Sequence, residues 1–118
     1  MGRDEFKEGL ETLGHTVELK DTEKAVVPYR ITEGRFAGTQ IQIGFQVPAD
    51  FPVTPPGGLH IHPRLIPINT GAMDNTRAAD SQPFGGEWQY LSRPYTQWPF
   101  KRTVKRYMEY VADILNTL

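Results

Sequence analysis

The sequence predicts an α+β protein of two layers: an N-terminal helix, an antiparallel sheet and a C-terminal helix packed on that sheet. Three segments carry this prediction: a short helical one near the N-terminus, an alternating one in the middle and an amphipathic one at the C-terminus. Because the 118 residues contain no linker and no internal repeat, we expect a single domain over residues 1–118.

Helices are expected at both ends of the chain. Phe6, Leu10 and Leu13 recur at helical spacing, and Gly14 is a stop signal. Near the other end, Pro99 suits the first helical position, because its missing amide hydrogen would be unpaired there anyway. An apolar stripe follows, made of Val104, Tyr107, Met108, Val111, Leu115 and Leu118. This stripe should pack on the sheet.

Between the helices, the pattern predicts a four-stranded antiparallel meander followed by a long irregular loop. The expected strands are residues 16–20, 25–32, 39–47 and 59–61. Pro28 indicates an edge or an irregular ladder in the second strand. The third strand is the clearest: its apolar face is Ile41, Ile43, Phe45 and Val47, and its other face is Gln40, Gln42, Gly44 and Gln46.

Composition narrows the function. A net charge of −1 argues against a nucleic-acid or anionic-membrane binder. We expect a cytoplasmic protein, because no apolar run reaches the length of a membrane span and the N-terminus lacks the apolar core of a signal peptide. The absence of cysteine excludes thiol nucleophiles and thiolate metal sites. No cofactor is indicated.

A proline-rich connection joins the third and fourth strands. Pro48 and Pro52 end the third strand, because neither can donate to a ladder. Pro55-Pro56 holds the chain extended, and Gly57-Gly58 permits a turn into the next strand. Such a rigid connection is suited to support a site in the loop that follows.

These features, in this order, resemble the core of ubiquitin-conjugating (E2) enzymes. The resemblance covers residues 16–118 and rests on Phe36-Ala-Gly-Thr, the alternating strand, the proline connection, His62-Pro63 and Trp98-Pro99. That family has an aromatic-x-Gly-Gly, a Pro-x-x-Tyr-Pro-x-x-Pro-Pro connection, His-Pro-Asn and Trp-x-Pro. It implies a UBC-like fold and, as partners, a ubiquitin-like protein and an E1-like activating enzyme.

The chain differs from the family at the residues that carry out the transfer reaction. The family asparagine position is Arg64, and without cysteine no thioester can form. His62 and Trp98 are 36 positions apart, which implies an insertion in the loop. Counting from His62 places the missing cysteine near residues 72–74, and counting back from Trp98 places it near residues 90–92. No single residue inherits the role.

The segment 85–98 resembles divergent prokaryotic E2-like proteins, which are encoded beside an E1-like activator, a ubiquitin-like protein and a metallopeptidase. Ser92 is a candidate nucleophile if His62 or His60 serves as its base, and Arg93 could stabilise an oxyanion. An oxyester would then replace the thioester. The simpler interpretation is that Ser92 is a polar turn residue. Ser81 is equally available, and an engineered replacement of a native cysteine is a further explanation.

The two histidines at positions 60 and 62 allow three roles. On a strand they project from the same face, so they could bind a metal with a third ligand from His15, Asp74, Asp80 or Glu87. In E2-like proteins the histidine of His-Pro is structural, and we favour that role over acid–base catalysis or metal binding. The aromatic residues Trp88, Tyr90, Tyr95 and Trp98 either cover the end of the core or anchor a binding interface.

Three functions are compatible with the sequence. We favour a non-catalytic E2-like module that binds a ubiquitin-like protein or its enzymes, because no nucleophile stands out. The second is an active carrier that transfers the modifier's acyl group through a hydroxyl group such as that of Ser92. The third is a UBC-fold binding module with an unrelated function.

Overall fold

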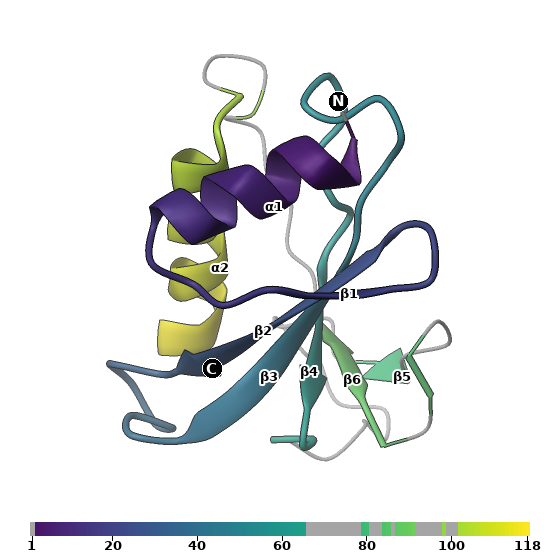
Figure 1. Cartoon of the computed structure of the whole chain (residues 1–118). Helices are drawn as coiled ribbons and strands as arrows, with labels where there is room; N and C mark the ends of the chain where they lie inside the picture. The colour runs from purple at the N-terminus through teal and green to yellow at the C-terminus, as the bar shows by residue number, and fades with distance from the viewer. Residues whose placement is uncertain (1, 66–78, 81–83, 86, 92–97, 99–101) are drawn as a thin grey trace.

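The computed structural model describes residues 2–65, 79–80, 84–85, 87–91, 98 and 102–118. These residues form an α+β fold, with both helices on one side of one sheet (Figure 1). The elements are α1 (Arg3–Thr12), β1 (Glu18–Lys20), β2 (Lys24–Arg30), β3 (Gln40–Gln46), β4 (Leu59–His62), β5 (Ala79–Asp80), β6 (Gln89–Leu91) and α2 (Val104–Asn116).

The sheet contains more strands than the sequence predicts. Its order within the described residues is β1-β2-β3-β4-β6-β5, and every neighbouring pair is antiparallel. The first four strands form the expected meander, but β6 pairs with β4 and β5 pairs with β6 inside the expected loop. The prediction of four strands was wrong because these two strands are only three and two residues long, which is too short to display an alternating pattern.

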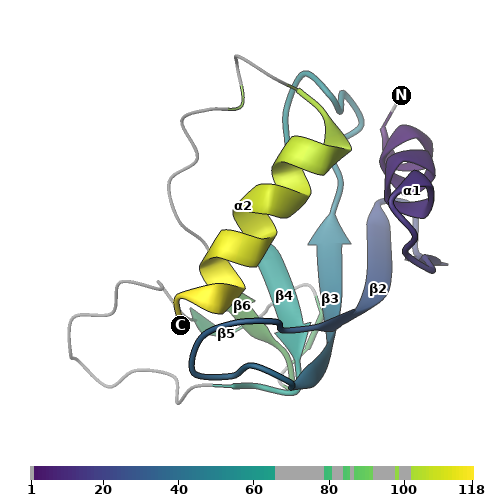
Figure 2. The same cartoon turned by 90° about the vertical axis from the view of Figure 1, so that its left-hand side faces the viewer.

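The core is built from residues of the sheet and of both helices. Figure 2 shows α2 in front of the sheet. Ile41, Ile43, Phe45 and Val47 are at most 2% exposed, which confirms the apolar face of β3. The ring of Phe45 lies 5.1 Å from that of Phe6 on α1 and 5.9 Å from that of Tyr107 on α2. Both helices therefore cover the same face of the sheet.

The ends of the helices differ from the prediction. α2 begins at Val104 rather than at Pro99, because Thr103 is its N-cap and its Oγ1 accepts a hydrogen bond of 3.1 Å from the amide of Arg106. Leu13 lies beyond the end of α1 and is 40% exposed, so it is not a core residue. In the predicted α2 stripe, the residues from Val104 to Leu115 are buried as expected, and Ile114 joins them. Leu118 lies beyond the end of α2 and is partly buried against the core.

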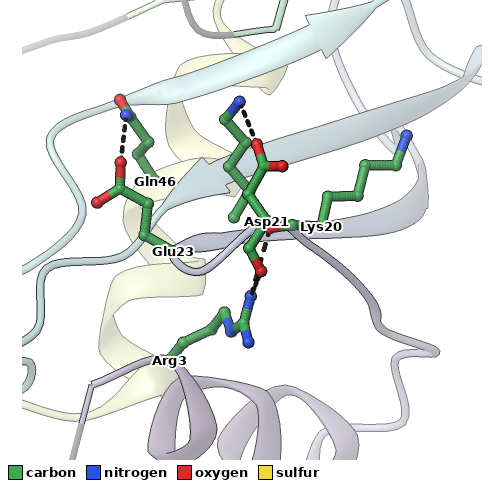
Figure 3. A network of polar contacts seen from close by, with 6 residues as sticks. Arg3, Lys20, Asp21, Glu23 and Gln46 are labelled. Atoms are coloured by element: carbon green, nitrogen blue, oxygen red, sulfur yellow. Dashed lines mark hydrogen bonds and ion pairs between the residues drawn. The ribbon is translucent and has the colours of Figure 1, made fainter.

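Polar contacts attach α1 to the turn between β1 and β2 (Figure 3). The guanidinium of Arg3 donates to the carbonyl oxygens of Lys20, at 3.3 Å, and of Asp21. In the same turn, Lys24 Nζ lies 2.8 Å from Asp21 Oδ2. These contacts fix the edge of the sheet against the start of the N-terminal helix.

Candidate functional site

The proline-rich connection is held in place by donors from the C-terminal part of the chain. The indole N–H of Trp98 donates to the carbonyl oxygens of Pro52, at 3.0 Å, and Val53, at 3.3 Å. The hydroxyl group of Tyr107 donates to the carbonyl oxygen of Pro56 at 3.0 Å. Proline has no amide hydrogen, but its carbonyl group still accepts, so these bonds fix the path that leads into β4.

Trp98 belongs to the core rather than to a binding surface. It is 4% exposed, and its ring lies 5.8 Å from Phe51 and 6.1 Å from Tyr107. Of the two roles that the sequence allows for the aromatic residues, covering the end of the core is the one that this environment supports for Trp98.

The histidines of β4 project from the face of the sheet opposite the helices, which we call the outer face. His60 is a cross-strand neighbour of Gly44 on β3 and of Tyr90 on β6. Directly paired residues share a face, and Gly44 lies between the core residues Ile43 and Phe45. The expected common face of His60 and His62 follows from the same alternation.

His60 is nevertheless buried, at 4% exposure. Its ring lies 4.6 Å from that of Phe84 and 4.8 Å from that of Tyr90. Phe84 can approach this closely because position 44 is glycine: a Cβ atom there would lie 2.5 Å from the Phe84 ring. We call His60, His62, Phe84, Trp88 and Tyr90 the outer-face cluster.

The environment of His60 makes it a packing residue. Burial, and to a smaller extent the positive charge of Lys24, lower the pKa of His60 to about 4. The imidazole is therefore neutral near pH 7. A general base that works near neutral pH needs a pKa close to that pH and access to its substrate, and His60 has neither. The structural role is the one that fits this position.

His62 is more accessible. Its side chain is 39% exposed, its ring lies 5.3 Å from that of Trp88, and its Nε2 lies 3.8 Å from Oε2 of Glu87. A histidine beside a carboxylate is an arrangement that acid–base catalysis uses. The role of His62 in catalysis stays a prediction, since the pair alone identifies no substrate.

Of the candidate metal ligands, only His15 and Glu87 have side chains that the structure describes, and only Glu87 lies close to a histidine of β4. His15 stacks on Tyr29 at 6.3 Å, and Glu87 lies beside His62. No group of three or more histidine, aspartate or glutamate residues that could hold a metal ion occurs among the described residues. Asp74, Ser81, Ser92, Arg93 and Tyr95 lie outside those residues, so the predictions made for them are not addressed.

Two residues of this region were missed by sequence reasoning. Gln89 is fully buried, and its Oε1 accepts a hydrogen bond of 3.0 Å from the amide of Leu65, which fixes the chain just after His62-Pro63. Phe84 covers the outer face. One feature of the sequence could have indicated that a side chain packs on this face, namely Gly44, the glycine in the otherwise polar face of β3. Gln89 has none, because its partner is the backbone of another segment.

A groove of about 510 Å³ lies between α1 and the start of α2. Its apolar lining includes Leu13, which is 40% exposed, and the buried residues Phe51 and Val104. The α1 residues that line it include Glu5 and Glu8, and the residues from the start of α2 include Arg102 and Lys105. The groove thus combines apolar surface with acidic and basic walls.

Comparisons of the chain with protein-family models, curated proteins and solved structures found no match. In the described part of the chain, neither helix has the length and hydrophobicity needed to cross a membrane.

Proposed function

We propose that this chain is an E2-like protein of a ubiquitin-like conjugation pathway and acts as a non-catalytic binding module. The observation that carries the proposal is the proline connection, which Trp98 and Tyr107 hold by hydrogen bonds and which leads into β4 and His62-Pro63. The three strands that precede it and the amphipathic helix near the end of the chain follow one another in the order that the resemblance implies. The absence of cysteine removes thioester chemistry.

The groove between α1 and α2 is the binding surface that we assign to this function. Its apolar surface can receive an apolar side chain, and its two charged walls favour a partner segment in which that side chain lies between a basic and an acidic residue. We propose that the E1-like activating enzyme supplies this segment.

The alternative function is a carrier that forms an oxyester through a hydroxyl group. The pair of His62 and Glu87 favours it, because a carboxylate can orient a histidine that acts as a base.

One experiment separates these functions. The protein is incubated with ATP and with each E1-like enzyme and ubiquitin-like protein encoded near its gene, and the products are analysed by intact mass and by calorimetric titration. The proposal expects binding without a covalent adduct. An adduct that resists reducing agent, is cleaved by hydroxylamine and disappears in Ser92→Ala would instead establish the carrier. Absence of both binding and adduct would leave a UBC-fold module with an unrelated function.

The groove is tested with a matched pair of exposed apolar residues. Leu13→Ser removes an apolar side chain from the groove, whereas Val53→Ser changes a residue that is 54% exposed and does not line it. We expect the first variant to weaken binding of the E1-like enzyme roughly tenfold and the second to change it less than twofold. Equal effects would exclude the groove as the binding surface.

A further inference from the structure

Phe84 fills a space on the outer face that a glycine leaves open. With a Cβ atom at Gly44 only 2.5 Å from the Phe84 ring, any other residue at position 44 would displace the ring. The ring also contacts His60 at 4.6 Å and Trp88 at 5.0 Å. Since Phe84 comes from the segment between β5 and β6, these contacts attach that segment to the middle of the sheet.

We propose that Phe84 is a latch that holds Glu87 and Trp88 on the outer face, and that protonation of His60 opens it. In the closed state the imidazole of His60 is 4% exposed and lies between Phe84 and Tyr90. When Phe84 leaves Gly44, one side of that enclosure is removed and water reaches the imidazole. The closed state therefore requires a neutral His60 imidazole, whereas the open state also accepts the protonated form.

Charged and titratable groups of the described residues lie around the latch, and the charge of Lys24 acts on His60 itself. From β2, Lys24 Nζ lies 5.3 Å from the centre of the Phe84 ring and 2.8 Å from Asp21 Oδ2. Among the described residues nearby are also Tyr90 on β6, His62 on β4 and Glu87 on the segment itself, whose carboxylate is 3.8 Å from His62 Nε2. An imidazolium at position 60 would add a second positive charge next to Lys24, while the two carboxylates are engaged with Lys24 and His62.

The direction of the pH dependence follows from the two states. Burial, with a smaller contribution from Lys24, holds the pKa of His60 at about 4 in the closed state, against 6.5 for an exposed histidine. The closed state binds fewer protons than the open state. Its stability relative to the open state is therefore greatest above pH 6.5 and decreases as the pH falls towards 4. Over that interval the opening constant rises by up to roughly 300-fold.

The two tryptophans provide separate reporters for the test. In ¹⁵N–¹H correlation spectra, the indole N–H of Trp88 reports on the latch. The indole N–H of Trp98, bonded to the carbonyl oxygen of Pro52 at 3.0 Å, reports on the core. On titration from neutral pH to below pH 4, we expect the Trp88 signal to shift to the position of an exposed indole while the Trp98 signal stays. Trp88→Phe assigns the signals.

Matched variants identify the sensor. His60→Phe keeps an aromatic ring but cannot be protonated, so it should abolish the transition. His62→Gln should retain it, which controls for the direct effect of His62 on Trp88 at 5.3 Å. Gly44→Ala should give the open Trp88 signal already at neutral pH, and Phe84→Ala should do the same if Gly44→Ala does not fold.

Three results would overturn the inference: a Trp88 signal that stays unchanged below pH 4, simultaneous loss of both indole signals, or a transition that persists in His60→Phe. The test uses the protein alone, so its outcome is independent of the proposed role in conjugation.

Discussion

The hydroxyl group of Tyr107 on α2 donates a 3.0 Å hydrogen bond to the carbonyl oxygen of Pro56, which lies 51 positions earlier in the chain. Both residues are buried. The bond joins the C-terminal helix to the connection that leads into β4, so the position of the histidine strand depends on a contact between distant segments.

Removal of this bond should destabilise the protein. Tyr107→Phe keeps the ring in the core but leaves the Pro56 carbonyl without this donor, which costs about 1–3 kcal/mol. Urea unfolding should show a lower midpoint with an unchanged slope. Tyr29→Phe is the control, because the Tyr29 hydroxyl makes no hydrogen bond to a described residue, and it should change the free energy of unfolding by less than about 0.5 kcal/mol. Equal losses in the two variants would contradict the role assigned to the bond.

Gly34 should tolerate no side chain. Its φ is +85°, and a Cβ atom would lie 2.1 Å from the carbonyl oxygen of Asn116 at the end of α2. Gly14 has a φ of +95° but no described atom within 4 Å of a Cβ, so Gly14→Ala carries the backbone strain alone, about 1–2 kcal/mol. Gly34→Ala adds a clash, and its loss of stability in thermal unfolding should exceed that of Gly14→Ala. The opposite order would show that the loop moves away from α2 without cost.

The N-cap of α2 should contribute about 1 kcal/mol. Thr103→Ala removes the oxygen that accepts from the amide of Arg106 at 3.1 Å, so the free energy of unfolding should fall by that amount. Thr103→Ser keeps the acceptor and should restore most of the loss. Chemical denaturation of the three proteins provides the comparison, and a serine variant as unstable as the alanine variant would point to the methyl group instead.

The charge of Lys24 should be visible in the titration of Asp21. A hydrogen bond from Lys24, and then its charge, lower the pKa of the Asp21 carboxyl below 3.8. A lowered carboxyl pKa stabilises the folded state above the unfolded value, and this contribution is lost as the pH falls through the folded value. NMR titration of Lys24→Met should show the Asp21 pKa rising towards 3.8, and Lys20→Met should raise it less. The reverse ranking would exclude Lys24 as the main cause.

Part of the candidate site can be predicted from the local sequence pattern. The spacing of His60 and His62 places both on one face of β4, and the structure has them there. The burial of His60 does not follow from that spacing, because the polar residues on the same face of β3 predict contact with solvent. Burial comes from Phe84, a residue 24 positions later that fits over Gly44. A single glycine in an alternating strand indicates available space, but not which side chain fills it.

The sequence by itself determined the two helices, the four-stranded meander and the face of β3 that meets the core, because hydrophobic periodicity is a local property. Tertiary structure decided the two additional strands, the start of α2, the hydrogen bonds that hold the proline connection and the enclosure of His60. Each of these depends on contacts between residues far apart in the chain. Only the folded arrangement specifies such contacts, because a side chain carries no local signal of the distant partner that it will meet.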